Sequence, residues 1–190
     1  YHIRMETILV TGATGNVGYE VIRHLRGIHP DASILAGVRH IEKARKLLGY
    51  DTECVRLDFR QPDTFHSLLK DTDRVFLVRP PQLSNVKRDI RPFIDSAHEN
   101  GVSHMVFVSL LGAETNSFAP HRKIEKEIQF AGIPYTFLRA GFFMQNLSTT
   151  HLKDIQDRGT IYLPAGKGKT SFIDAYDIGE TAALVLSSEK

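Results

Sequence analysis

The chain has 190 residues, which is enough for one domain with a sizeable buried core and marginal for two. Hydrophobic residues make up 42% of the sequence and charged residues 24%, values typical of globular proteins that argue against a disordered or fibrous chain. The net charge of +2, with acids and bases interspersed, argues against a nucleic-acid-binding face, and no apolar run approaches the roughly 20 residues of a membrane helix.

Short apolar runs alternate with longer amphipathic stretches along the chain. We place one domain at residues 5–190 and expect the four residues before Met5 to lie outside it. The apolar runs predict strands over 7–11, 33–38, 53–57, 74–78, 104–109 and 135–139. The amphipathic stretches predict helices over 16–27, 40–49, 61–70, 84–100, 118–131, 142–158 and 175–187.

This alternation predicts a Rossmann-type α/β fold, which is a doubly wound parallel sheet with right-handed crossovers. Most of the predicted strands lack polar–apolar alternation, as is typical of parallel strands buried on both faces. Proteins of this fold usually cover the substrate with extra loops or a lobe above the carboxyl ends of the strands. Little sequence follows the last predicted helix, so we expect that lobe to be missing or incomplete.

Three glycines, Gly12, Gly15 and Gly18, lie between the first predicted strand and the first predicted helix. In this context Gly12 permits a sharp turn, Gly15 lets a pyrophosphate approach the backbone, and Gly18 lets the helix pack closely. The free N–H groups at the start of the helix favour negative charge. The turn therefore predicts a dinucleotide site formed by Thr11, Gly12, Thr14, Gly15, Asn16, Val17 and Gly18.

The residues after the next strands indicate which dinucleotide binds. Arg39 follows the second predicted strand and suits the 2′-phosphate of NADP; the alternative is an exposed arginine in a solvated loop. Asp58 and Phe59 close the third strand, where Asp58 either meets the adenine or caps the next helix. Arg79 and two prolines follow the fourth strand, where the nicotinamide half should pass. These positions predict NADP, taken up as NADPH.

The glycine spacing resembles that of the extended and atypical short-chain dehydrogenases/reductases. Their chemistry usually comes from a Tyr-x-x-x-Lys pair on the helix after the fifth strand, with a serine near the end of that strand. Here Ser109 is in register, but His121 and Glu125 occupy the tyrosine and lysine positions. With the segments "LRAGFFMQNL" and "FIDAYDIGETAALVL", the chain resembles the NmrA-like branch from Thr7 to about Leu186, in particular the type 2 NADPH:quinone oxidoreductases and triphenylmethane-reductase-like enzymes.

The resemblance implies an NADPH-dependent reductase that transfers hydride to a quinone or a similar flat conjugated acceptor. In such an enzyme His121 is the candidate general acid, with Ser109 beside it; the alternative is that His121 only begins its helix. Phe143 would stack on the substrate and Asn146 would hydrogen-bond it, although aromatic residues after a strand commonly belong to the core. A quinone tolerates the missing Tyr–Lys pair because solvent can protonate the reduced product.

The runner-up function is a non-catalytic NAD(P) sensor, a role known in the same branch, which loss of the dyad also predicts. A sugar-nucleotide epimerase or dehydratase is disfavoured because that chemistry relies on the tyrosine.

The basic loop Gly166–Lys169 either reaches a phosphate or, as we expect, is solvated. The histidines show no metal-ligand spacing, and the single Cys54 forms no internal disulfide, so we expect a metal-free protein of the reducing cytoplasm. Its expected partner is a small-molecule acceptor, without direct nucleic-acid or membrane contact, and a homodimer is left open.

Overall fold

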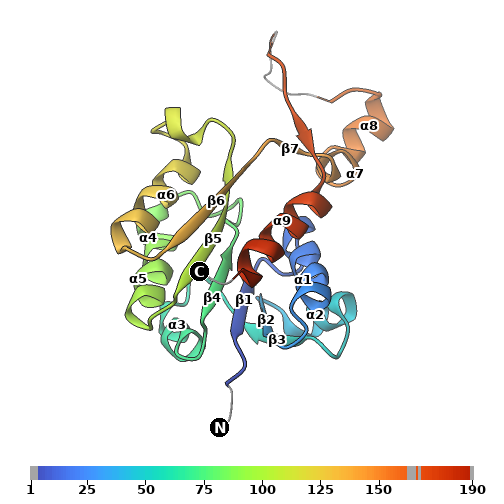
Figure 1. Cartoon of the computed structure of the whole chain (residues 1–190). Coiled ribbons are helices and arrows are strands. Elements are labelled where there is room, and N and C mark those ends of the chain that lie inside the picture. The colour runs from blue at the N-terminus through green and yellow to red at the C-terminus, as the bar shows by residue number, and fades with distance from the viewer. Residues whose placement is uncertain (1–3, 162–165, 167, 189–190) are drawn as a thin grey trace.

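A six-stranded sheet with the order β3-β2-β1-β4-β5-β6 forms the centre of the protein (Figure 1). The computed structural model describes residues 4–161, 166 and 168–188. The strands of the sheet are β1 (Thr7–Thr11), β2 (Ser33–Val38), β3 (Glu53–Arg56), β4 (Arg74–Leu77), β5 (His104–Leu110) and β6 (Tyr135–Ala140). All neighbouring pairs are parallel, which confirms the predicted doubly wound sheet. The order reverses between β1 and β4, the place where open α/β sheets bind ligands.

Helices cover both faces of this sheet. One face carries α1 (Asn16–Ile28), α2 (Ile41–Leu48) and α9 (Ala175–Ser187). The other carries α3 (Phe65–Leu69), α4 (Val86–Asp89), α5 (Arg91–Glu99) and α6 (Pro120–Ala131). Each layer buries its own apolar cluster against the sheet, and no helix of the described residues is long and apolar enough to cross a membrane.

Two predicted helices are shorter than the periodicity indicates, and a proline lies at the start of an element in each of them. The helix predicted over 84–100 is interrupted at Ile90, because Pro92 near the start of α5 has no N–H with which to continue the hydrogen-bond ladder. The helix predicted over 61–70 starts as a 3₁₀ turn at Pro62–Thr64 before α3. A second 3₁₀ turn, Ala113–Thr115, precedes α6.

The helix predicted over 142–158 is wrong at its start. The segment begins with β7 (Phe142–Phe143), which pairs in parallel with β8 (Phe172–Ile173), and continues as α7 (Gln145–Ser148) and α8 (Leu152–Arg158). These elements form an arm that extends beyond the carboxyl edge of the main sheet (Figure 1). The prediction for the basic loop Gly166–Lys169 cannot be followed there, since Lys167 lies outside the described residues.

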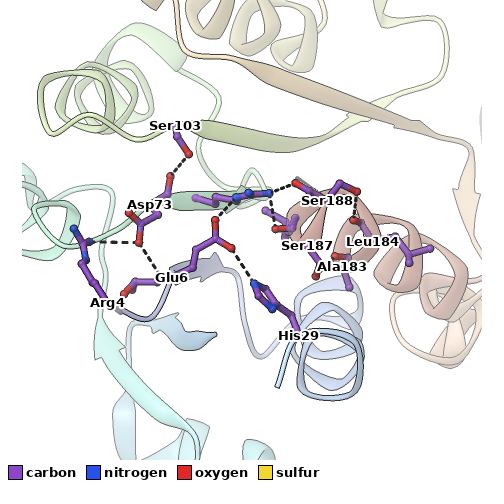
Figure 2. Close-up of polar contacts among 12 residues, drawn as sticks. Arg4, Glu6, His29, Asp73, Ser103, Ala183, Leu184, Ser187 and Ser188 are labelled. Carbon is purple, nitrogen blue, oxygen red and sulfur yellow. Dashed lines mark hydrogen bonds and ion pairs between the residues drawn. The ribbon is translucent and has the colours of Figure 1, made fainter. Parts of the chain in front are cut away.

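A polar network joins Arg4 and the end of α9 to the amino edge of the sheet (Figure 2). Arg4, expected to lie outside the domain, contacts it: its guanidinium donates to the carbonyl oxygen of Asp71 at 3.0 Å and pairs with Asp73 at 3.4 Å. Asp73 in turn accepts from the backbone N–H of Thr7 at 2.8 Å. The contacts of Asp73 therefore tie the start of β1 to the start of β4.

Arg74 holds the last helix on the sheet. Its Nε lies 2.5 Å from the carboxylate of Glu6, which also contacts His29 at 2.9 Å. The same guanidinium donates to the carbonyl oxygens of Leu186 and Ser188 at 2.9 and 2.8 Å. These carbonyls belong to the end of α9, where helices leave acceptors without intrahelical partners.

Replacing Arg74 with methionine removes these contacts while keeping much of the side-chain volume. We expect Arg74→Met to lower the free energy of unfolding by about 2 kcal/mol, because the Glu6 carboxylate and the α9 carbonyls lose a charged donor. Arg45→Met is the matched control: among the described residues, Glu42 on the surface of α2 is the one ion-pair partner of Arg45, so we expect a change below about 0.5 kcal/mol. Urea denaturation measures both, and equal changes in the two variants would contradict the role of Arg74.

Candidate functional site

A cavity of about 400 Å³ lies at the carboxyl edge of the sheet. Its walls come from the turn between β1 and α1 that carries Gly12 and Gly15 (the glycine turn), from the ends of β2 and β3, and from the loop after β4. The predicted cofactor-binding residues that line it are Gly12, Thr14, Gly15, Arg39, Asp58, Phe59 and Arg79. The structure thus brings residues from four separate segments of the sequence to one cavity.

The glycine turn has the geometry that its sequence predicts. Gly12 has a φ of +60°, a left-handed conformation that favours glycine. The N–H of Gly15 donates to the carbonyl oxygen of Gly12 at 2.8 Å, which closes the turn. A Cβ on Gly18 would lie 2.3 Å from that same oxygen, so only glycine lets α1 start this close to the turn. Gly15 is the N-cap of α1 and supplies no side chain to its free N–H groups, which leaves them for a ligand.

Thr11 and Val17 support the turn from behind. Thr11 is fully buried, and its hydroxyl accepts from the backbone N–H of Val78 at 2.9 Å, which joins β1 to the end of β4. Val17 packs into the apolar cluster under α1. Their side chains therefore fix the position of the turn and are not among those that line the cavity.

The end of the cavity next to β2 and β3 is rich in arginine. Arg39 is exposed at its rim, and no acidic side chain of the described residues pairs with it. Phe59 is only 6% exposed and packs edge-to-face on Phe93, with 5.1 Å between ring centroids. Phe59 is therefore mainly a core residue that anchors the segment carrying Asp58 and Arg60 into the cavity wall.

Arg79 organises the loop after β4. Its Nη1 donates to the carbonyl oxygens of Pro80, Pro81 and Leu83 at 3.2, 3.0 and 3.1 Å. The side chain is half-buried, and burial lowers the pKa of its guanidinium from the ordinary value. Arg79 thus shapes this wall of the cavity through the backbone of its own loop.

Ser109 is tied into a buried charged network that sequence reasoning missed. Its side chain is 1% exposed and donates to Oε1 of Glu125 at 2.6 Å. Glu125 is fully buried and accepts from Nε and Nη2 of Arg139 at 3.0 and 3.1 Å and from Arg122 at 2.9 Å. Burial alone would raise the pKa of Glu125, but hydrogen bonds from Arg139, Ser109 and Arg122 outweigh it and hold that pKa below its ordinary value.

A signal for this network is present in the sequence. Glu125 sits on the same helical stripe as the apolar residues Ile124 and Ile128, so the pattern places an acid on a buried face. A buried carboxylate requires cationic partners. The partner Arg139 lies on β6, far enough along the chain that periodicity alone does not identify it.

His121 lies one helical turn before Glu125. Its ring stacks on Phe107, with 6.0 Å between centroids and 25° between planes. Burial first, and then the positive charge of Arg79, lower the pKa of His121 from 6.5 to about 4, while Glu125 opposes this shift. The imidazole is therefore neutral at pH 7. It can donate one hydrogen bond, but it lacks the additional proton expected of a general acid at that pH.

The predicted substrate residues lie on the arm. Phe143 is half-buried against the apolar cluster of α1 and α9, and Asn146 is half-buried in α7. Gln145 was not predicted: its side-chain amide donates to Asp174 at 2.6 Å and accepts from the N–H of Ala175 at 2.9 Å. This amide connects α7 to the start of α9.

Asn16 and Gln145 belong to a second hollow, of about 330 Å³, on the other side of the glycine turn. Thr14 and Gly15 line both hollows, so the turn separates them. The described part of the chain holds no cluster of three or more side chains suited to bind a metal ion.

The fold and the glycine turn define a Rossmann-like α/β protein with a cavity at its topological switch point. The chain belongs to the NmrA-like family, whose family model matches residues 4–190.

Relatives of known name include NAD(P)H azoreductase from Xenophilus azovorans, 35% identical over 184 residues, and quinone oxidoreductase 2 from Escherichia coli, 29% identical over 183 residues. Both alignments cover 95% of this chain but only 63% and 64% of the relatives, so the chain spans less than two thirds of their length.

Solved structures of reductases are also similar to this chain. Triphenylmethane reductase from Citrobacter sp., crystallised with NADP(H), has a TM-score of 0.82 and 27% identity over 98% of this chain and 67% of that one. Quinone oxidoreductase 2 from Escherichia coli, crystallised with NADPH, has a TM-score of 0.83 and 29% identity over 96% of this chain and 65% of that one.

The glycine turn can be tested within a single helix. We expect Gly18→Ala to lower the free energy of unfolding by about 2 kcal/mol, because its Cβ would collide with the Gly12 carbonyl oxygen. Gly27→Ala, near the other end of α1, is the control: its Cβ would meet no atom within 4 Å, so we expect a gain of about 0.5–1 kcal/mol. Urea denaturation of both variants tests the difference, and a neutral Gly18→Ala would contradict the close packing.

The low pKa of His121 makes a prediction about stability and pH. The folded protein binds fewer protons at His121 than the unfolded chain does, so this residue's contribution to stability is present above pH 6.5 and is lost as the pH falls toward about 4. His121→Phe removes the titrating group and keeps an aromatic ring against Phe107. We expect the variant to gain stability relative to wild type as the pH falls through this window. Urea denaturation at a series of pH values measures this. A difference in the free energy of unfolding between variant and wild type that stays constant from pH 6.5 to 4 would contradict the low pKa of His121.

Proposed function

We propose that residues 5–190 form an NADP-binding domain and supply the cofactor site of an NADPH-dependent reductase. The observation that carries the proposal is the cavity that joins the side-chain-free turn at Gly12 and Gly15 to the guanidinium of Arg39, which has no ion-pair partner among the described residues. The free N–H groups at the start of α1 suit a pyrophosphate, and Arg39 suits a 2′-phosphate. Asp58, which lines the same cavity, is the proposed contact of the adenine. The crystal structures of relatives with NADPH or NADP(H) support this choice of cofactor.

We infer a quinone or another flat conjugated molecule as the acceptor. The related proteins are named as quinone, azo and triphenylmethane reductases, and such acceptors all present extended conjugated systems. Bound NADPH supplies the hydride in this chemistry, and the chain supplies orientation and shielding from water. We place this acceptor beside His121, where the nearby charges of Glu125 and Arg139 are already paired with each other.

The proposed roles of the side chains follow from their contacts. The neutral ring of His121 donates a hydrogen bond to the acceptor oxygen that becomes negative, and solvent protonates the product. Ser109, held by Glu125, positions the end of β5 near this ring. Phe143 and Asn146 approach the acceptor from the arm. These roles require no imidazolium and no Tyr–Lys pair.

A non-catalytic NAD(P) sensor is the second candidate. The observation that favours it is the state of the two predicted catalytic residues: His121 is neutral and Ser109 is engaged with Glu125. A sensor would keep the cofactor cavity and dispense with an acceptor site. The two candidates therefore differ in turnover and agree in cofactor binding.

Turnover of 1,4-benzoquinone distinguishes the two. We expect the chain to oxidise NADPH in its presence, seen as loss of the reduced-nicotinamide absorbance, at a kcat/KM about tenfold or more above that with NADH, because only NADPH presents the phosphate for Arg39. Protein heated until unfolded is the control for the direct reaction. Binding of NADPH without turnover on a panel of quinones would contradict the reductase and support the sensor.

A further inference from the structure

A second guanidinium lines the same end of the cavity as Arg39. Arg60 follows β3 and is exposed at the cavity rim. In the part of the chain that the structure describes, its guanidinium has no hydrogen-bond or ion-pair partner, and the same holds for Arg39. The rim of one cavity thus carries two cationic side chains whose charges are not neutralised by direct contact.

The backbone places the two arginines together. The N–H of Leu57 donates to the carbonyl oxygen of Val38 at 2.9 Å, so the segments that begin at Arg39 and Asp58 leave the sheet side by side. The turn after β3 is rigid in two ways. Phe59 is anchored in the core, and the N–H of Arg60 donates to the Asp58 carboxylate at 3.0 Å. The backbone at Arg60 is therefore held in place before any ligand binds, which reduces the entropy lost on binding.

The carboxylates near Arg39 and Arg60 do not neutralise the two guanidinium charges, which can therefore attract an anionic ligand. The positive charge of Arg60 helps to lower the pKa of Asp89. Both oxygens of that buried carboxylate, however, already accept hydrogen bonds from Arg88, at 2.6 and 3.0 Å. Among the described residues that line the cavity, Asp58 is the only carboxylate, against the three cations Arg39, Arg60 and Arg79. A phosphate monoester carries about −1.5 to −2 charges near pH 7, and its oxygens match the donor pattern of guanidinium groups.

We propose that Arg60 and Arg39 together bind the 2′-phosphate of NADP, and that Arg60 is a second residue that sets the preference for NADP over NAD. The inference rests on the proposed cofactor site and adds a residue to it. Arg39 reaches the phosphate from the end of β2 and Arg60 from the end of β3. The two guanidinium groups bind opposite sides of the phosphate and leave the Asp58 carboxylate for the adenine.

Two adenine nucleotides test this without any turnover. Isothermal calorimetry on the full chain compares 2′,5′-ADP, which carries the 2′-phosphate, with 5′-AMP, which lacks it. We expect Arg60→Ala to weaken 2′,5′-ADP binding about tenfold or more and to leave 5′-AMP within about twofold. Arg56→Ala is the matched control, since Arg56 is an exposed arginine on β3 that does not line the cavity, and we expect no change with either nucleotide.

The double variant Arg39→Ala/Arg60→Ala completes the test. If both arginines bind the 2′-phosphate, this variant binds the two nucleotides with nearly equal affinity. An equal loss for both nucleotides in Arg60→Ala would place Arg60 on the adenosine and overturn the proposal, as would no loss at all. If the nucleotide preferences follow the proposal but NADPH reduces no quinone, the reductase fails while the two-arginine site stands. If the wild-type chain binds neither nucleotide, both proposals fail.

Discussion

The contact between the start of α1 and the turn before it determines the geometry of the whole site. Gly18 lies so close to the carbonyl oxygen of Gly12 that a methyl group does not fit between them. This packing directs the first free N–H groups of α1 toward the carboxyl edge of the sheet, where the strand order reverses between β1 and β4. The hydroxyl of Thr11 fixes the same turn to the end of β4. In the proposed site, the position of the pyrophosphate therefore depends on backbone atoms that these close contacts hold in place.

Charge is distributed unevenly around this turn. At the end next to β2 and β3, Arg39 and Arg60 line the cavity without direct acidic partners among the described residues. On the side of β5 and α6, the buried carboxylate of Glu125 is fully paired, and the ring of His121 is neutral at pH 7. An unneutralised cation attracts an anion, whereas a charge-paired apolar region suits a neutral conjugated molecule. This asymmetry is what a site for a phosphorylated cofactor and an uncharged acceptor requires.

The sequence predicts the parts of the protein that depend on local pattern. The six strands of the sheet and the glycine turn follow from apolar runs and residue spacing, and the structure confirms them. The pairing of β7 with β8 joins residues about thirty positions apart through strands of two residues each, too short to show periodicity. The contact of Glu125 with Ser109 and Arg139 is likewise a tertiary contact between elements. The pKa of His121 depends on its burial and on the charge of Arg79, which the sequence alone does not reveal.

Backbone amide chemical shifts, recorded by NMR during titration with NADP⁺, test the central claim most directly. If the pyrophosphate binds at the start of α1, the largest changes occur at Thr14, Gly15 and Asn16, with further changes at Arg39 and Arg60. Lys123 and Lys126, which line a separate basic hollow between α4 and α6, serve as the internal reference and stay unchanged. Changes confined to that hollow, or a glycine turn that does not respond to saturating NADP⁺, would contradict the account.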